Sequence, residues 1–71
     1  MQSKPRASKG AYDSPIASRR LSAGLTQEQV AQHLSVHPST VRRWESGEVM
    51  PRKQALLALA QLLHCTPGDL L

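Results

Sequence analysis

The 71-residue sequence contains a single cysteine, Cys65, and no long apolar run. One cysteine excludes an internal disulfide framework and fits a protein of a reducing compartment. Because no uninterrupted apolar run of about 18 residues occurs, the sequence predicts no transmembrane helix. The N-terminus also lacks the apolar core of a signal peptide, so we do not expect secretion. Together these absences predict a cytoplasmic protein.

The sequence also lacks a recognisable catalytic or metal-binding set. No Ser-His-Asp or Cys-His group stands in a supporting context, so we do not expect an enzyme. His33 and His37 are four residues apart and His64 adjoins Cys65, but a zinc site needs convergent ligands with defined spacing. The helix that carries His33 is predicted to end before His37. We therefore expect no metal ion and no other cofactor, and Cys65 is interpreted as a small buried hydrophobic residue.

The chain is short and basic. A chain of this length forms at most one domain, and such domains bury only about 60% of their unfolded surface, so helix packing or dimerisation has to supply the stability. Nine Lys and Arg residues against five Asp and Glu residues give a net charge of +4 and a pI near 10.0. A small basic domain favours a polyanionic partner, although a mild positive charge also serves solubility alone.

Residues 1–13 differ in composition from the rest of the chain. They contain Lys4, Arg6 and Lys9 among Ser, Pro and Gly, with almost no apolar side chains. Such a segment cannot bury enough surface to order itself, so we expect a disordered basic arm. The arm either lies along a groove of DNA or is a leader without a role. Residues 14–71 are then expected to form the folded domain.

The first two predicted helices have clear start and stop signals. Ser14 and Pro15 suit the cap and the first position of a helix, and Gly24 suits the position just after its last turn. Thr26 and Gln29 have the spacing of a capping box, in which each side chain bonds to the backbone of the other residue. The second helix therefore begins at Thr26.

Three further helices are predicted after a tight turn. Pro38 starts the third helix, because proline suits a first turn and breaks a helix interior, and Gly47 ends it. A fourth helix runs from residue 52 to about residue 63, with leucines and alanines in an apolar stripe at helical spacing. Residues 66–71 open a short fifth helix. The sequence thus predicts an all-α domain of five helices with no convincing strand.

The third predicted helix has two different faces. At about 100° per residue, Val41 and Trp44 lie toward the core and Glu45 lies at its edge. Arginine can bond guanine bidentately, and serine can bond bases or phosphates. Such side chains also occur on ordinary solvated faces, but the capped helix directly before favours a helix-turn-helix whose second helix enters the major groove. The outward side carries two arginines and two serines, Ser39, Arg42, Arg43 and Ser46.

The stretch from Gly24 to Gly47, followed by Pro51, resembles the lambda-repressor-like helix-turn-helix family of the Cro and XRE type. That family includes phage repressors, Cro proteins and many small bacterial regulators. The Leu-Thr-Gln start of the second helix and the Trp-Glu-Ser-Gly end of the third carry the resemblance together, and it covers about residues 16–71. The resemblance implies a five-helix DNA-binding bundle that forms a homodimer on a two-fold-symmetric operator. We expect a nucleoid-associated transcriptional regulator that occupies an operator and blocks or recruits polymerase. A repressor is the first expectation, and an activator remains open.

The resemblance further implies roles for single residues. Gln27 matches a glutamine that reaches a phosphate and braces the third helix, while Ser39 and Arg43 match positions that touch base edges. Arg20 and Glu45 match the two partners of a structural ion pair. The full set expected at double-stranded DNA is Gln27, Pro38, Ser39, Thr40, Arg42, Arg43, Ser46, Arg52 and Lys53.

Three residues depart from the family pattern. Pro38 stands where many members have a polar base-reading residue, and it offers only an apolar contact to a thymine methyl. His37 precedes the third helix in place of the usual Ser or Thr cap. His64 follows the fourth helix where Gly is common. We expect the two histidine turns to be weaker than in the family.

The sequence leaves alternatives to a stand-alone, sequence-specific regulator. One is a protein-interaction module, such as an antitoxin that binds a toxin as well as DNA, with the basic arm or the leucines of the fourth helix as the contact. Another is the DNA-binding fragment of a longer regulator. A dimer patch would leave several leucines exposed, whereas packing on the first and last helices would bury them. The leucines in question are Leu57, Leu62, Leu70 and Leu71.

Overall fold

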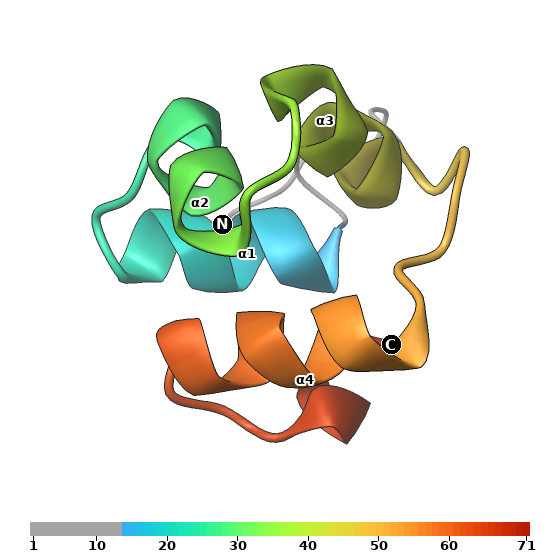
Figure 1. Ribbon diagram of the computed structural model, residues 1–71. Coiled ribbons are helices and arrows are strands. Elements are labelled where there is room, and N and C mark those ends of the chain that lie inside the picture. The colour runs from blue at the N-terminus through green and yellow to red at the C-terminus, as the bar shows by residue number, and fades with distance from the viewer. Residues whose placement is uncertain (1–13) are drawn as a thin grey trace, which may run out of the picture.

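A computed structural model describes residues 14–71 of the chain. In Figure 1, α2 and α3 lie side by side above α1, and α4 lies below it. The expected basic arm of residues 1–13 lies outside the described residues. Within residues 14–71 there is no strand, and the elements are α1 (Pro15–Ser22), α2 (Gln27–Leu34), α3 (Pro38–Ser46), α4 (Lys53–Leu62) and the 3-10 helix η1 (Pro67–Leu70).

The all-α class is as predicted, but the fifth α-helix is not present in residues 14–71. The segment after Thr66 forms only the four-residue 3-10 helix η1, because so few residues do not complete an α-helical hydrogen-bond ladder. The Thr66 N–H donates to Asp69 Oδ2 at 3.1 Å and so fixes this turn. Helix α4 is one residue shorter at each end than predicted, since Arg52 is its cap and Leu63 already has non-helical backbone angles.

The helix ends follow the local signals of the sequence. The Ser14 hydroxyl accepts a hydrogen bond from the Ala17 N–H at 3.2 Å and caps α1. At the start of α2, the Gln29 N–H donates to Thr26 Oγ1 at 3.0 Å, and the Thr26 N–H donates to Gln29 Oε1 at 2.8 Å. Gly47 ends α3 with a φ of 83°, a left-handed conformation that glycine adopts without steric penalty.

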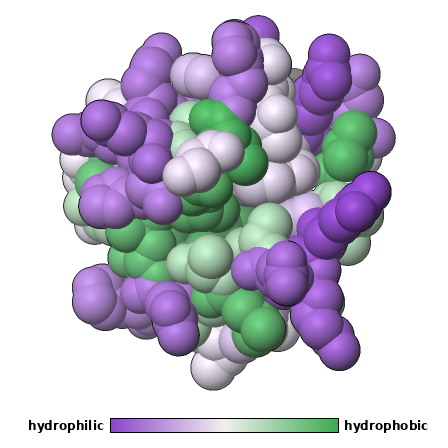
Figure 2. All heavy atoms as spheres, viewed as in Figure 1, coloured by the Kyte–Doolittle hydropathy of each residue, from purple (hydrophilic) through white to green (hydrophobic). Residues whose placement is uncertain are grey.

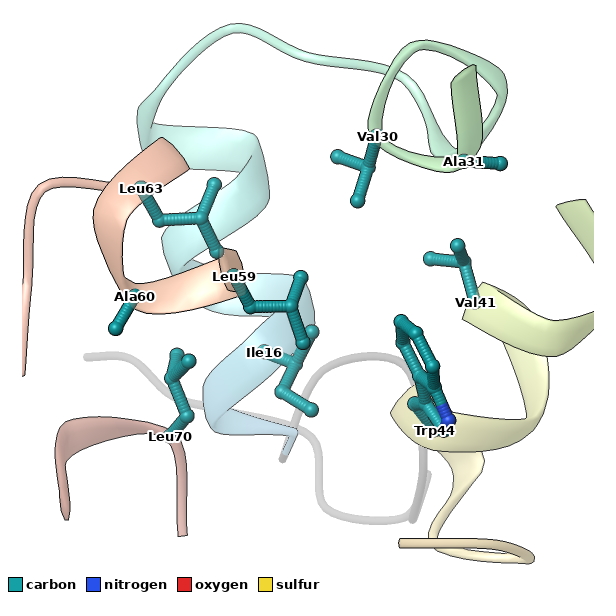
Figure 3. Close-up of a cluster of buried hydrophobic side chains, with 9 residues drawn as sticks. All are labelled: Ile16, Val30, Ala31, Val41, Trp44, Leu59, Ala60, Leu63 and Leu70. Atoms are coloured by element: carbon teal, nitrogen blue, oxygen red, sulfur yellow. The ribbon is translucent and has the colours of Figure 1, made fainter. Parts of the chain in front are cut away.

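One apolar cluster holds the helices together (Figure 3). Val30 of α2, Val41 of α3 and Leu59 of α4 have no solvent exposure. Trp44 is 7% exposed, and Figure 3 shows its ring pointing inward beside Ile16, so its predicted place in the core is confirmed. The buried members are Ile16, Val30, Ala31, Val41, Trp44, Leu59, Ala60, Leu63 and Leu70.

The four leucines that the sequence assigns either to a dimer patch or to the core divide between core and surface. Leu70 is buried and Leu62 packs against the core, whereas Leu57 is 49% and Leu71 is 68% exposed. Figure 2 shows hydrophobic residues in the middle of one face, with hydrophilic residues around them. Cys65 is only partly buried, although it packs against the core. No helix within residues 14–71 has the length and apolar character needed to cross a membrane.

Candidate nucleic-acid interface

A polar network anchors α3 to the two helices before it. Arg20 of α1 donates from Nε to Glu45 Oε2 at 2.6 Å and from Nη2 to Glu45 Oε1 at 3.3 Å. Gln27 of α2 donates from Nε2 to Glu45 Oε1 at 2.8 Å. Arg20 Nη1 also donates to the Leu25 carbonyl at 2.9 Å, in the loop between α1 and α2. The Glu45 carboxylate therefore accepts hydrogen bonds from both neighbouring helices.

This network is largely shielded from water. The side chain of Glu45 is 4% exposed and that of Arg20 is 12% exposed. A buried carboxylate is tolerated when its charge is paired and its oxygens are hydrogen-bonded, and both conditions hold here. Glu45 is buried on the core side of α3, whereas the periodicity of the helix predicts it at the edge of the core. The network fixes the rotation of α3 about its own axis, because Glu45 has to point at α1 and α2.

The opposite side of α3 faces solvent and is basic. Arg42, Arg43 and Ser46 are exposed, and Ser39 is half-buried near the start of the helix. Neither arginine takes part in the two ion pairs found within residues 14–71. Arg42 and Arg43 thus present guanidinium groups to solvent from a helix that the Glu45 network holds in place. Pro38 and Thr40 are half-buried and lie at the same N-terminal end.

The N-terminal end of α3 has a cap that the sequence pattern did not predict. His37 Nδ1 accepts a hydrogen bond from the Ser39 N–H at 3.1 Å, so the imidazole takes the place of a Ser or Thr cap. The Ser39 hydroxyl oxygen lies 2.9 Å from the same nitrogen. The sequence predicts a weaker turn here than in the family, and the structure shows that His37 itself supplies a side-chain cap. A histidine is a rare cap, and the general preference for Ser, Thr, Asp or Asn hid its role.

The other predicted site residues lie at the end of α3, at the start of α4 and at the start of α2. The Ser46 hydroxyl donates to the Arg43 carbonyl at 3.1 Å and accepts from the Glu48 N–H at 3.3 Å, so it stabilises the end of α3. Arg52 and Lys53 are exposed at the start of α4. Gln27 is half-buried and uses one N–H of its amide on Glu45, which leaves the second N–H for another acceptor.

The exposed face of α3 is a surface and not a cavity. A hollow of about 420 Å³ lies at the other end of α3, between Ser14, Trp44, Met50 and Leu71. Its lining includes none of the outward residues Ser39, Arg42 and Arg43. Within residues 14–71, no three His, Cys, Asp or Glu side chains come together as a metal site would require. The candidate site therefore suits a macromolecular surface more than a small ligand.

A second ion pair lies away from this face and was not predicted. Arg19 Nη2 of α1 is 3.6 Å from Asp69 Oδ2 of η1, and both side chains are more than two-fifths exposed, at 45% and 42%. The Thr66 backbone N–H, then the Thr66 hydroxyl, and finally Arg19 hold the pKa of Asp69 below its ordinary value of 3.8. Pairs between exposed groups contribute little to stability, so this contact only supports the position of η1.

A helix-turn-helix family model matches residues 16–70. The chain belongs to the helix-turn-helix family. The match runs from the second residue of α1 to the end of η1 and confirms the resemblance of the stretch from Gly24 to Gly47. The HTH-type transcriptional activator BcrR of Enterococcus faecalis is 30% identical over 60 residues. These cover 84% of this chain but only 29% of BcrR, so the chain spans less than a third of that relative. No solved structure matches the chain significantly.

Proposed function

We propose that this chain is a sequence-specific regulator of transcription that binds double-stranded DNA and places α3 in the major groove. The supporting observation is the pair of opposite faces on α3. Glu45 on one face is fixed to α1 and α2 by Arg20 and Gln27. On the other face, Arg42 and Arg43 are exposed and stand in no ion pair within residues 14–71. Family membership supports the same role, because helix-turn-helix domains read DNA with the second helix of the motif, which is α3 in this chain.

Base reading is assigned to the outward residues of α3. Arg43 offers a planar set of donors that fits guanine O6 and N7, and Ser39 lies one turn earlier on the same side. Thr40 and Pro38 are half-buried at the N-terminal end and would contact the groove at its edge, with Pro38 limited to an apolar contact. Ser46 takes a smaller part than the sequence suggested, since its hydroxyl already bonds to the backbone.

Phosphate contacts are assigned to exposed cations of α3 and α4 and to Gln27 of α2. Arg42, Arg52 and Lys53 are exposed cations, and the second amide N–H of Gln27 is available to a phosphate. The basic residues of segment 1–13 would add to the same electrostatic attraction. These contacts carry no sequence information, so they set affinity and its salt dependence, while α3 sets the preferred sequence.

The assembly and the direction of regulation are part of the proposal. A helix-turn-helix domain reads one half-site, so a homodimer on a two-fold-symmetric operator is the expected complex. A repressor would act by occupying this operator. BcrR is named an activator, so a relative with a similar segment regulates transcription in the opposite direction. A reporter gene downstream of the selected operator would separate the two, because a repressor lowers expression and an activator raises it.

A protein-interaction module is the weaker alternative. Its contact would be the basic residues of segment 1–13 or the leucines of α4, of which Leu57 is 49% exposed. Single exposed leucines are ordinary on soluble domains, and Leu62 packs against the core. The exposed basic face of α3, held in place by the Glu45 network on the opposite face, therefore favours DNA over a protein as the main partner.

The experiment that tests the function is selection of binding sites from random DNA duplexes, followed by affinity measurements at several salt concentrations. We expect an enriched motif with two half-sites about one helical turn apart. Arg43→Ala should lose about 1–3 kcal/mol on the selected site and much less on random DNA. Lys53→Ala should weaken both duplexes alike and make the salt slope shallower.

Arg19→Ala is the matched control for these variants. It removes the same positive charge from an exposed arginine that lies on α1 and pairs with Asp69, away from the outward face of α3. Its affinity for the selected site should remain close to that of the unchanged protein. Failure to enrich any motif would contradict the proposed function, and equal losses of Arg43→Ala on selected and random DNA would contradict the reading role of Arg43.

A further inference from the structure

The His37 imidazole and the Ser39 side chain form one hydrogen-bonded unit at the start of α3. Ser39 contacts the same ring nitrogen twice, from its backbone N–H at 3.1 Å and from its hydroxyl oxygen at 2.9 Å. His37 is exposed and Ser39 is half-buried. Neither ion pair of residues 14–71 includes His37, and therefore no carboxylate in that range lies within 4.0 Å of its ring nitrogens.

The backbone contact decides where the ring proton is. A backbone N–H only donates, so Nδ1 has to accept and carries a lone pair. The neutral ring therefore has its proton on Nε2. Since Nδ1 has no proton to give to Ser39 Oγ, the hydroxyl is the donor in this contact and shares the one lone pair of Nδ1 with the backbone N–H. The only hydrogen of the Ser39 hydroxyl is then directed at His37.

This arrangement limits what Ser39 offers to a ligand. Its hydroxyl oxygen presents only lone pairs outward, whereas a serine without such a neighbour can donate or accept. In the major groove, adenine N6 and cytosine N4 are donors, while guanine O6 and N7 and thymine O4 are acceptors. A lone-pair surface attracts the amino bases and repels the acceptor edges.

We propose that His37 is a positioning residue that makes Ser39 a hydrogen-bond acceptor, so that the base facing Ser39 is an adenine or a cytosine. This inference rests on the proposed function, because it requires α3 in a major groove. His37 acts through the Ser39 hydroxyl and needs no contact with the base itself. The hydrogen-bond geometry at the start of α3 thereby restricts one base position of the operator to adenine or cytosine.

The test is site selection with four proteins, the unchanged chain, Ser39→Ala, His37→Gly and the double variant. The position at which Ser39→Ala loses preference identifies the base that faces Ser39. The unchanged chain should prefer adenine or cytosine there by about fivefold, the factor that one neutral hydrogen bond supplies. Glycine removes the imidazole yet remains an acceptable cap residue, so His37→Gly should still fold. It should lower the preference at this position to about twofold or less, because the hydroxyl is again free to donate.

Two further measurements separate positioning from a structural role. A variant that only loosened α3 would lose affinity for every base alike, whereas His37→Gly should change the preference at one position. In the Ser39→Ala background, His37→Gly should change nothing at that position, because the effect runs through the hydroxyl. His37→Asn should restore the preference for adenine or cytosine, since its amide oxygen accepts from both Ser39 groups and asparagine caps helices well.

The outcomes distinguish this inference from the function on which it rests. An enriched motif with guanine or thymine opposite Ser39 would overturn the inference and leave the proposed function intact. The same holds if Ser39→Ala changes no position, if His37→Gly keeps the full preference, or if its effect persists without the Ser39 hydroxyl. Absence of any enriched motif would overturn the proposed function, and the inference with it.

Discussion

Replacing Glu45 with glutamine is the most direct perturbation of the network that holds α3. The substitution keeps the size of the side chain but removes the negative charge between Arg20 and Gln27. It also replaces one carboxylate oxygen with an NH2 group that has no lone pair for its donors. At least one of the donors that Glu45 now satisfies then faces another donor.

The expected loss of stability follows from the burial of the pair. Arg20 is 12% exposed in its side chain, so its guanidinium would be left charged and largely out of water. Removing one partner of a buried ion pair destabilises a protein by about 3–5 kcal/mol. The total stability of a domain of this size is about 3–9 kcal/mol. Glu45→Gln should therefore leave a large fraction of the protein unfolded at room temperature.

Urea unfolding followed by tryptophan fluorescence measures this effect. Trp44 is the only tryptophan in the sequence and is 7% exposed, so it reports on the same helix. Glu48→Gln is the control, because it makes the same chemical change at an exposed residue outside both ion pairs of residues 14–71. It should alter the free energy of unfolding by about 0.5 kcal/mol or less. If both variants lose under about 1 kcal/mol, the Glu45 network does not hold α3.

Two smaller predictions concern the turns after α3 and α4 and the charge of Asp69. His64 has a φ of 57°, a left-handed conformation that glycine adopts more easily, so His64→Gly should raise the free energy of unfolding by about 1 kcal/mol. Gly47 has a φ of 83°, and no atom lies within 4 Å of an added Cβ. Gly47→Ala should therefore lower the free energy of unfolding by about 1–2 kcal/mol through backbone strain alone. Urea midpoints of both variants check this, and equal shifts of one sign would contradict it. Because folding lowers the pKa of Asp69, its charge stabilises the fold above pH 3.8, and this contribution is lost as the pH falls through the folded-state pKa. The unchanged chain should therefore lose stability relative to Asp69→Asn as the pH falls below 3.8, and a constant difference across that range would argue against the sign.

The order of the helices and the positions of their caps could be predicted because these signals are local. Ser14, Thr26 and Gly47 act within one turn of the chain, and each forms the cap or turn that its residue type favours. The inward position of Val41 and Trp44 follows from helical periodicity in the same way. Family resemblance added the pairing of Arg20 with Glu45, which periodicity alone does not give, since the two residues are far apart in sequence.

Features that depend on three-dimensional packing or on unusual residue choices could not be predicted from the sequence. The cap at His37 needs a particular ring orientation that no propensity encodes. The pair between Arg19 and Asp69 depends on how η1 lies against α1, and the four-residue length of η1 decides its 3-10 form. The exposure of Leu57 depends on which side of α4 meets the core, because leucines occur on more than one side of that helix.

The Arg20–Glu45 ion pair that holds α3 is consistent with the proposed function, in which the outward side chains of α3 have to reach atoms of DNA bases at fixed positions. An apolar pair at positions 20 and 45 can be as stable as a buried ion pair, so stability alone does not require charge there. Apolar contacts, however, tolerate sliding and rotation, whereas the two bonds from Arg20 and the one from Gln27 constrain Glu45 in direction as well as distance. A rotation of α3 would move Arg43 and Ser39 together across the groove. Under the proposed function, the polar network therefore ties the accuracy of base reading to the side of the helix opposite the proposed DNA contact.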